Sequence, residues 1–317
     1  MKEDGLIIAG GGYEAKLYPE AGGALVTLNK GRIRVFAPCS SLGEAQEAPT
    51  RHGLPCLFPP NRIDAGHFVF EGREYQFPMK PNKANNFSHG FLQTRPWMVA
   101  QRTDDSVTMR FDCQEGTDFY PYYPHQFRMD VTYGLTQEGL SQTVRLTNGS
   151  AEDMPVGLGW HTAFCLPFVP GSDATGIRFR ASVGKRILLN ERMLPTGEVR
   201  ILDEEEMRIR SAEGQSPIYR PMDDHFTAQP MEWRGKPFHG AILEDRQAGA
   251  RIVYEVDPAY RHWMIFNAHS SGNLICIEPQ NWRINAPNLG LPEEEAGIDV
   301  LKPGQSREYR SRIWVEE

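Results

Sequence analysis

Four segments of the sequence place ionisable or amide side chains among the glycines and prolines of constrained loops. They are RHGLPCLFPPNRIDAGHFVFEG at 51–72, SHGFLQTRPW at 88–97, PVGLGWHTAFCLPF at 155–168 and NLICIEPQNWRINAPN at 273–288. Their candidate functional residues are Arg51, Asn61, Arg62, His89, His161 and Glu278. A histidine and a glutamate that shared one cleft would suit general acid–base chemistry near neutral pH.

Glu278 is the candidate that a structural role explains least well, because it ends an apolar run and precedes a proline. An ionised carboxylate is costly to bury, so Glu278 must either reach water or have a partner and a shifted pKa. The other candidates have ordinary structural explanations. Arg62 could form a surface ion pair, His89 could hydrogen-bond a turn, and His161 could be a satisfied core histidine.

The segments around these candidates alternate apolar and polar residues with a period of two, which is typical of strands. FRMDVTYGL at 127–135 and LSQTVRLTN at 140–148 flank a short polar turn and predict a β-hairpin. Similar alternation occurs in SVTMRFDC, GREYQF, ARIVYEVD, RHWMIFNA, NLICIE and SREYRSRIWVEE, whereas only LDEEEMRIRSAE near 202 predicts a helix. We therefore expect an all-β sandwich or barrel with few short helices.

Length and composition limit the other possibilities. The 317 residues show no composition break or internal repeat, so we expect a single domain over 1–317. A net charge of -7 without a dense Lys/Arg run argues against nucleic acid as a partner. The start, MKEDGLIIAGGG, resembles neither a signal peptide nor an anchor, and no stretch approaches the ~20 apolar residues of a spanning helix. A soluble, cytoplasmic monomer or homodimer is the resulting expectation.

Cysteine and histidine spacing gives no sign of a metal site. The five cysteines are scattered without a CxxC pair, which predicts free, mostly buried thiols. Seven histidines show no ligand spacing such as HExxH: His52, His67, His125, His225, His239, His262 and His269. Of these, His225 is a candidate to line the cleft, and we expect the rest at the surface or in turns.

Seven fragments together resemble the aldose 1-epimerase (galactose mutarotase-like) family. They are RHGLPCLFPPNRIDAGHF, FEGREY, NNFSHGF, GWHTAF, LPTGE, MDDHF and IEPQNWRINAPN, and they follow that family's order and approximate spacing over about residues 20 to 312. The resemblance implies a large antiparallel β-sandwich, the galactose mutarotase-like supersandwich, whose concave face holds a monosaccharide. It also implies that Glu278 is the base on the anomeric hydroxyl and that His161 protonates the ring oxygen.

The same resemblance implies sugar-binding roles for several residues. His89 of the His-Gly motif and Arg62 of the Asn-Arg motif would bind and orient the sugar, with Asn61 beside Arg62. An aspartate of MDDHF would hold sugar hydroxyls; Asp223 is favoured over Asp224, but the doublet leaves this open. Aromatic candidates for an apolar floor beneath the sugar ring are Phe91, Trp97, Trp160 and Trp282.

The implied reaction explains these residue types. Interconversion of anomers requires the C1 hydroxyl to lose a proton while the ring oxygen gains one, so a base and an acid are needed on opposite sides of the sugar. Burial would raise the pKa of Glu278, and a nearby carboxylate would help His161 to hold its proton. Neither a metal nor a redox cofactor is required.

Departures from the family pattern leave the substrate open. HTAFCLPF replaces the Tyr-Phe-Asn-Leu run that usually follows the central histidine in galactose mutarotases, and RHGLPCLFP is closer to the broader epimerase branch. One alternative is a hexose-6-phosphate 1-epimerase, in which Arg51, Arg95 and Arg283 are candidate phosphate ligands. Another is a carbohydrate-binding protein without catalytic activity.

Overall fold

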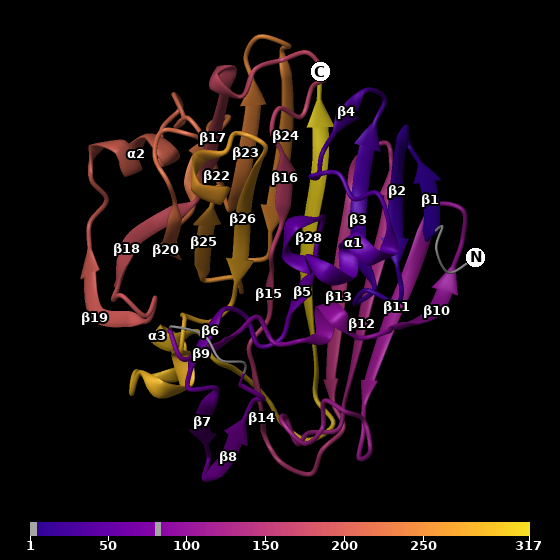
Figure 1. Ribbon diagram of the computed structural model, residues 1–317, viewed down its shortest axis with the longest axis vertical. Coiled ribbons are helices and arrows are strands. Elements are labelled where there is room, and N and C mark those ends of the chain that lie inside the picture. Colours follow the sequence, from indigo (N-terminus) through magenta and orange to yellow (C-terminus); the bar gives the residue numbers. More distant parts are fainter. Residues whose placement is uncertain (1–4, 80–83) are drawn as a thin grey trace.

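The computed structural model describes residues 5–79 and 84–317, and two large antiparallel sheets dominate it (Figure 1). The first sheet has the strand order β10 (Met98–Arg102), β11 (Ser106–Cys113), β12 (Phe127–Thr136), β13 (Gly139–Asn148), β28 (Ser306–Glu316), β24 (Ala250–Val256), β23 (Gly240–Asp245) and β17 (Ile177–Ala181). The second sheet has the order β19 (Pro195–Arg200), β18 (Val183–Leu189), β20 (Asp223–Ala228), β25 (His262–Phe266), β26 (Leu274–Gln280), β15 (Gly159–Trp160) and β5 (Cys56–Leu57), and β16 (Ala163–Cys165) also pairs with β26.

Smaller elements surround these sheets. Four strands form a separate sheet beside the first one: β1 (Leu6–Gly10), β2 (Tyr13–Tyr18), β3 (Ala24–Lys30) and β4 (Ile33–Arg34). The two-stranded pairs are β6 (Arg62–Asp64) with β9 (Asn86–Ser88), β7 (His67–Phe70) with β8 (Arg73–Gln76), β14 (Met154–Val156) with β27 (Asp299–Leu301), and β21 (Met231–Trp233) with β22 (Lys236–Phe238). The helices are α1 (Leu42–Glu47), α2 (Glu204–Arg210) and α3 (Glu293–Ala296), with 3-10 turns η1 (Pro49–Arg51), η2 (Leu92–Thr94), η3 (Ala174–Gly176), η4 (Ala268–Ser270) and η5 (Ala286–Asn288).

The strand predictions are confirmed. Strands β12 and β13 form the predicted hairpin, with a register that runs from Phe127 opposite Asn148 to Thr136 opposite Gly139. The six other alternating runs correspond to β11, β8, β24, β25, β26 and β28. The predicted helix is α2, which begins with a capping box formed by its N-cap Asp203 and by Glu206 in its first turn. Helices α1 and α3, of six and four residues, were not predicted, because they are shorter still than α2 and show no helical period.

The two large sheets pack face to face. The sulfur atoms of Cys56 in β5 and Met129 in β12 lie 3.7 Å apart, and the rings of Phe164 in β16 and Tyr254 in β24 have centroids 5.8 Å apart. The apolar cluster that these residues share includes side chains from both sheets. The predicted all-β sandwich is therefore confirmed.

The second sheet presents its opposite face to a pocket. In β26, Ile275 and Ile277 join the apolar core, whereas Cys276 and Glu278 line the pocket. Successive side chains of a strand point to opposite faces, so this alternation follows from the pleat. Strand β25 continues the pocket face, because its residues Met264 and Phe266 pair directly with Glu278 and Cys276.

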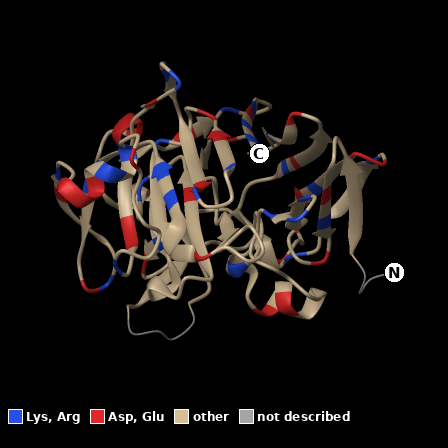
Figure 2. Cartoon of the chain, turned by 90° about the horizontal axis from the view of Figure 1, so that it is seen from above, with Lys and Arg blue, Asp and Glu red and all other residues tan. Residues whose placement is uncertain are grey.

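The structure also agrees with the predictions made from the cysteines and the charged residues. All five cysteines are buried and free, as predicted. Figure 2 shows basic and acidic residues interspersed over the molecule, without a large field of one sign. Within 5–79 and 84–317, we find no helix with the length and apolar character needed to cross a bilayer.

Candidate active site

A pocket of about 240 Å³ brings the four sequence segments together. It is lined by Thr50, Arg51, Asn61, Arg62, His89, His161, Asp223, Met264, Phe266, Ala268, Leu274, Cys276 and Glu278. This volume is smaller than the about 300–1,000 Å³ of sites for drug-sized ligands, so the pocket suits a compact small molecule.

The pocket contains a buried contact between His161 and Glu278. The Nε2 atom of His161 lies 3.1 Å from Oε1 of Glu278, and the side chains are 10% and 3% exposed. Strand β26 holds Glu278, while the backbone N–H of His161 donates to the carbonyl of Pro55 at 3.2 Å. The expectation that the two groups flank opposite sides of a ligand does not match this geometry. They are neighbours.

Burial shifts the two groups in opposite directions. Desolvation, helped by the negative charge of Asp223, raises the pKa of Glu278 well above its usual range, although Arg62 opposes the shift. Desolvation lowers the pKa of His161 to about 4. The direction expected for Glu278 is found, but that expected for His161 is reversed because its own burial outweighs the neighbouring carboxylate. Both shifts favour the uncharged forms of the pair, a protonated Glu278 and a neutral His161.

Arg62 links two other polar residues of the pocket. Its Nη2 donates to Oδ2 of Asp223 at 2.9 Å, and its Nη1 donates to Oδ1 of Asn61 at 3.1 Å. Asn61 is buried and has a positive φ of 56°, in the left-handed region that asparagine tolerates. The planar guanidinium thus fixes a carboxylate and an amide beside Glu278.

His89 completes the polar wall. Its ring centroid lies 5.3 Å from that of His161, and its backbone N–H donates to the carbonyl of Asn61 at 2.8 Å. The next residue, Gly90, has φ +62°, and a Cβ there would lie 2.0 Å from the carbonyl oxygen of Phe58. Only glycine fits this approach, which fixes the turn that holds His89. Desolvation keeps the pKa of His89 well below its usual range, so its ring is neutral.

Several expected ligands lie elsewhere. Asp224 points away from the pocket and contacts Arg186 and Arg220, each at 2.5 Å. Arg95 pairs with Asp118 at 2.6 Å outside the pocket. Arg283 is buried and does not line the pocket either. Of the three arginines considered for a phosphate, only Arg51 reaches the site, where it is exposed and forms no ion pair with a described residue.

The apolar part of the pocket was missed by sequence reasoning. Phe266 and Met264 provide it, together with Leu274, whereas the pocket lining includes none of Phe91, Trp97, Trp160 and Trp282. Strand periodicity could have identified these residues and Cys276. Leu274 and Cys276 lie four and two residues before Glu278 in one strand, so they share its face.

The expectation that the remaining histidines lie at the surface or in turns is wrong for His262, which is buried in strand β25. His52, His125, His225 and His262 are buried, and the rings of His225 and His262 lie 5.3 Å apart in the second sheet. His225 does not line the pocket. Strands β20 and β25 place His225 and His262 inside the fold, which the absence of a metal-ligand spacing could not reveal.

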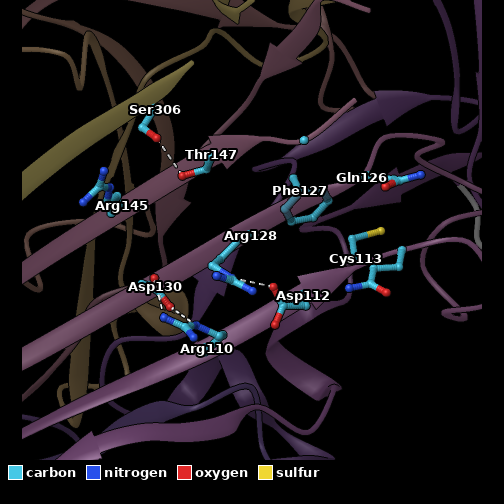
Figure 3. A pocket seen from close by; sticks show the side chains of 12 residues that line it. Arg110, Asp112, Cys113, Gln126, Phe127, Arg128, Asp130, Arg145, Thr147 and Ser306 are labelled. Atoms are coloured by element: carbon cyan, nitrogen blue, oxygen red, sulfur yellow. Dashed lines mark hydrogen bonds and ion pairs between the residues drawn. The ribbon is translucent and has the colours of Figure 1, made fainter. Parts of the chain in front are cut away.

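A larger hollow of about 510 Å³ lies on the exposed face of the first sheet (Figure 3). Its charged residues largely satisfy one another: Arg110 contacts Asp130 at 2.6 Å, and Arg128 contacts Asp112 at 2.7 Å. Thr147 and Ser306 likewise share a hydrogen bond of 2.7 Å. This ladder of cross-strand pairs is typical of a solvated sheet face. It offers no counterpart to the buried His161–Glu278 contact, so we place the chemistry in the smaller pocket.

Comparisons with known proteins agree with this architecture. Residues 6–314 match the family model described as aldose 1-epimerase. A galactose mutarotase-like protein from Clostridium acetobutylicum is 33% identical and superposes with a TM-score of 0.94 over 98% of this chain and 94% of that one. Protein YphB of Escherichia coli is 25% identical over 94% of both chains, and galactose mutarotase of Rattus norvegicus is 22% identical over 81% of this chain and 75% of its own. The chain therefore belongs to the aldose 1-epimerase family and is an isomerase of that type.

Proposed function

We propose that the protein interconverts the α and β anomers of an aldohexose by opening and reclosing the sugar ring, without a cofactor. Glu278 acts as the base and His161 as the acid. The observation that carries this proposal is their buried 3.1 Å contact in a pocket of small-molecule size. Both reacting oxygens of the sugar are bonded to C1, so two adjacent protein groups can reach them from one side.

Ring opening needs the carboxylate and imidazolium form of the pair. It forms when the shared proton moves from Glu278 to Nε2 of His161. The carboxylate then takes the proton of the C1 hydroxyl while the imidazolium gives its proton to the ring oxygen, and the C1–O5 bond breaks to leave an open-chain aldehyde. The pair returns to its uncharged state, with the proton on Glu278. Rotation about C1–C2 and the reverse transfers then close the ring with the other configuration.

The remaining pocket residues orient the sugar. Arg62, Asp223, Asn61 and His89 provide donors and acceptors for hydroxyl groups, and Phe266 provides apolar surface for the ring. The positive charge of Arg62 also opposes the rise in the pKa of Glu278. This charge favours the ionised state of Glu278 when the sugar is bound. These fixed groups would hold C1 against the acid–base pair.

The test is exchange NMR, which measures anomer interconversion directly. Wild-type protein should accelerate exchange of D-glucose or D-galactose above the buffer rate without added metal. Sugar that binds, as shown by saturation transfer, but exchanges no faster than in buffer would instead identify a carbohydrate-binding protein. Absence of both binding and exchange for a panel of aldohexoses would refute the proposed substrate class.

A hexose 6-phosphate is a second candidate substrate, because Arg51 lines the pocket. This exposed guanidinium at the pocket could pair with a phosphate. Arg51→Ala should then lower kcat/KM for glucose 6-phosphate by about 10-fold or more, the value of a charged hydrogen bond, while glucose is little affected. Equal effects on both sugars would exclude phosphate recognition by Arg51.

A further inference from the structure

The thiol of Cys276 lies beside His161 and Glu278, the proposed acid–base pair of the pocket. One ligand atom from each of His161, Cys276 and Glu278, all three of them buried, lies within 4.8 Å of the other two. Cys276 follows from the pleat of β26, which places it on the same face as Glu278, and it lines the same pocket. The proposed epimerase chemistry gives this thiol no role.

We propose that His161, Cys276 and Glu278 form a binding site for Zn²⁺ or a similar thiophilic divalent cation, and that the bound cation inhibits the enzyme. Metal binding follows from the arrangement of these three side chains alone. Its inhibitory effect rests on the proposed function.

The three donors suit zinc in type and spacing. Imidazole nitrogen, thiolate sulfur and carboxylate oxygen bind Zn²⁺ at about 2.0–2.3 Å, and a tetrahedral site with three protein ligands leaves one position for water. The 3.1 Å between Nε2 and Oε1 is already close to a ligand–ligand separation in such a site. The pocket provides the entry path and room for the water.

Charge balance also favours a dication. Zn²⁺ displaces the proton of the Cys276 thiol and the proton of the His161–Glu278 pair. The resulting thiolate and carboxylate together carry two negative charges that the cation neutralises, so the bound site places little net charge in a buried position. Magnesium lacks this fit because it requires oxygen ligands in octahedral geometry and avoids thiolate. The site therefore discriminates between two common divalent ions.

Occupation by zinc would stop the proposed reaction. The cation takes the lone pair of Nε2 and the carboxylate of Glu278, which are the acid and the base. It also lies where the C1 oxygens of the sugar would bind. Inhibition should therefore be competitive with the sugar.

The chain contains a second group of metal-ligand type, which provides an internal control. Cys39, Glu44 and His52 also place one ligand atom each within 4.8 Å of the others. None of these three residues lines the pocket. Removal of Cys39 should leave zinc inhibition unchanged, although it also removes a buried thiol.

The experiment measures anomer exchange in the presence of Zn²⁺ or Mg²⁺ for wild type, Cys276→Ala, Cys276→Ser and Cys39→Ala, each relative to its own rate without metal. Zinc should inhibit wild type and Cys39→Ala equally, and magnesium should inhibit neither. Both Cys276 variants should require at least about 100-fold more zinc, the upper end of what the loss of an outer-shell partner costs. Unchanged zinc inhibition in both Cys276 variants, or its loss in Cys39→Ala, would overturn the proposal.

Binding is followed separately with Co²⁺, so that the site is tested even if the protein does not catalyse. Because Cys39 belongs to the second group, the band is read in its absence: a thiolate-to-cobalt charge-transfer band should appear in Cys39→Ala and be missing when Cys39→Ala is combined with Cys276→Ala or Cys276→Ser. A band that persists when both Cys39 and Cys276 are replaced, or no band in Cys39→Ala, contradicts the metal site itself. Failure of the proposed function would instead leave the cobalt band intact while no protein-dependent exchange is seen.

Discussion

At the scale of single residues, desolvation decides the chemistry of the pocket. It raises the pKa of Glu278 and lowers that of His161, which favours an uncharged pair; in the mechanism that we propose, one internal proton transfer then prepares the pair for reaction. An exposed glutamate and histidine would rest as carboxylate and partly protonated imidazole, and water would compete for both. Because Glu278 and His161 are buried in contact with each other, the protonation of the proposed base is coupled to that of the proposed acid.

Arg62 is the residue whose geometry is most demanding, because two of its nitrogens bind two different side chains. Arg62→Lys keeps the charge but cannot bond both Asn61 and Asp223 from one ammonium in the same geometry. We expect kcat/KM to fall by about 10- to 100-fold, since a charged hydrogen bond contributes about 1.5–3 kcal/mol. Steady-state polarimetry measures this change. A lysine variant as active as wild type would show that the fork geometry is unimportant.

The sequence could predict residue types at the site but not every partner. The unusual position of Glu278 and the family resemblance led to His161, Arg62 and His89, which the fold brings together. Arg283 was considered because it lies five residues from Glu278 along the chain. Sequence proximity did not determine its direction, and the chain after β26 takes it out of the pocket.

At the scale of elements, the pleat of β20 separates two adjacent aspartates. Asp223 pairs with Phe266 on the pocket face, while Asp224 pairs with Ile265 and joins a buried ionic group with Arg186 and Arg220. The sequence shows that the two must face opposite ways. The sequence cannot show which of the two faces carries the pocket, because both members of the doublet are aspartates.

Replacing each aspartate separately should therefore give different results. Asp223→Asn should lower kcat/KM by about 10-fold or more through the lost charged bond to Arg62, with little effect on the urea midpoint. Asp224→Asn should lower the free energy of unfolding by about 3–5 kcal/mol, as expected when a buried ion pair is broken. Urea denaturation and polarimetry of both variants check this. Equal loss of stability in the two would contradict the assignment of faces.

At the scale of the whole molecule, packing of the two sheets creates the core, and the opposite face of the second sheet carries the site. The apolar cluster between them includes residues from Ile8 to Val315, which supports our proposal that the chain forms one domain. Alternating patterns predicted the strands and the sandwich class. The order of strands within each sheet was out of reach, because β28 lies between β13 and β24 through contacts between distant parts of the chain.

Buried neutral histidines should make the fold sensitive to acid. Desolvation lowers the pKa to about 4 for His125 and His161 and to about 3 for His262, against about 6.5 in an unfolded chain. The unfolded state therefore binds more protons, so their contribution is complete above pH ~6.5 and is lost as pH falls toward 4. Each contributes up to about 1.4 kcal/mol per pH unit in that window. Glu278, with its raised pKa, has the opposite sign and offsets one of them.

Urea unfolding at pH 7 and pH 5.5 measures this dependence. The free energy of unfolding should be lower at pH 5.5, and His125→Gln should reduce the difference by removing one titrating group. The exposed His269 gives the matched control, since His269→Gln should leave the difference unchanged. Stability that does not fall between pH 7 and pH 5.5 would mean that these histidines titrate normally in the folded protein.

The most direct test of the central claim is exchange NMR of sugar anomers with wild type and Glu278→Gln, beside Arg145→Ala as a control in the hollow of the first sheet. We predict that Glu278→Gln retains its fold and loses about 10²- to 10⁴-fold in exchange rate, the usual contribution of general acid–base catalysis, while Arg145→Ala matches wild type. Exchange by Glu278→Gln at the wild-type rate would contradict the assignment of the reaction to the buried pair.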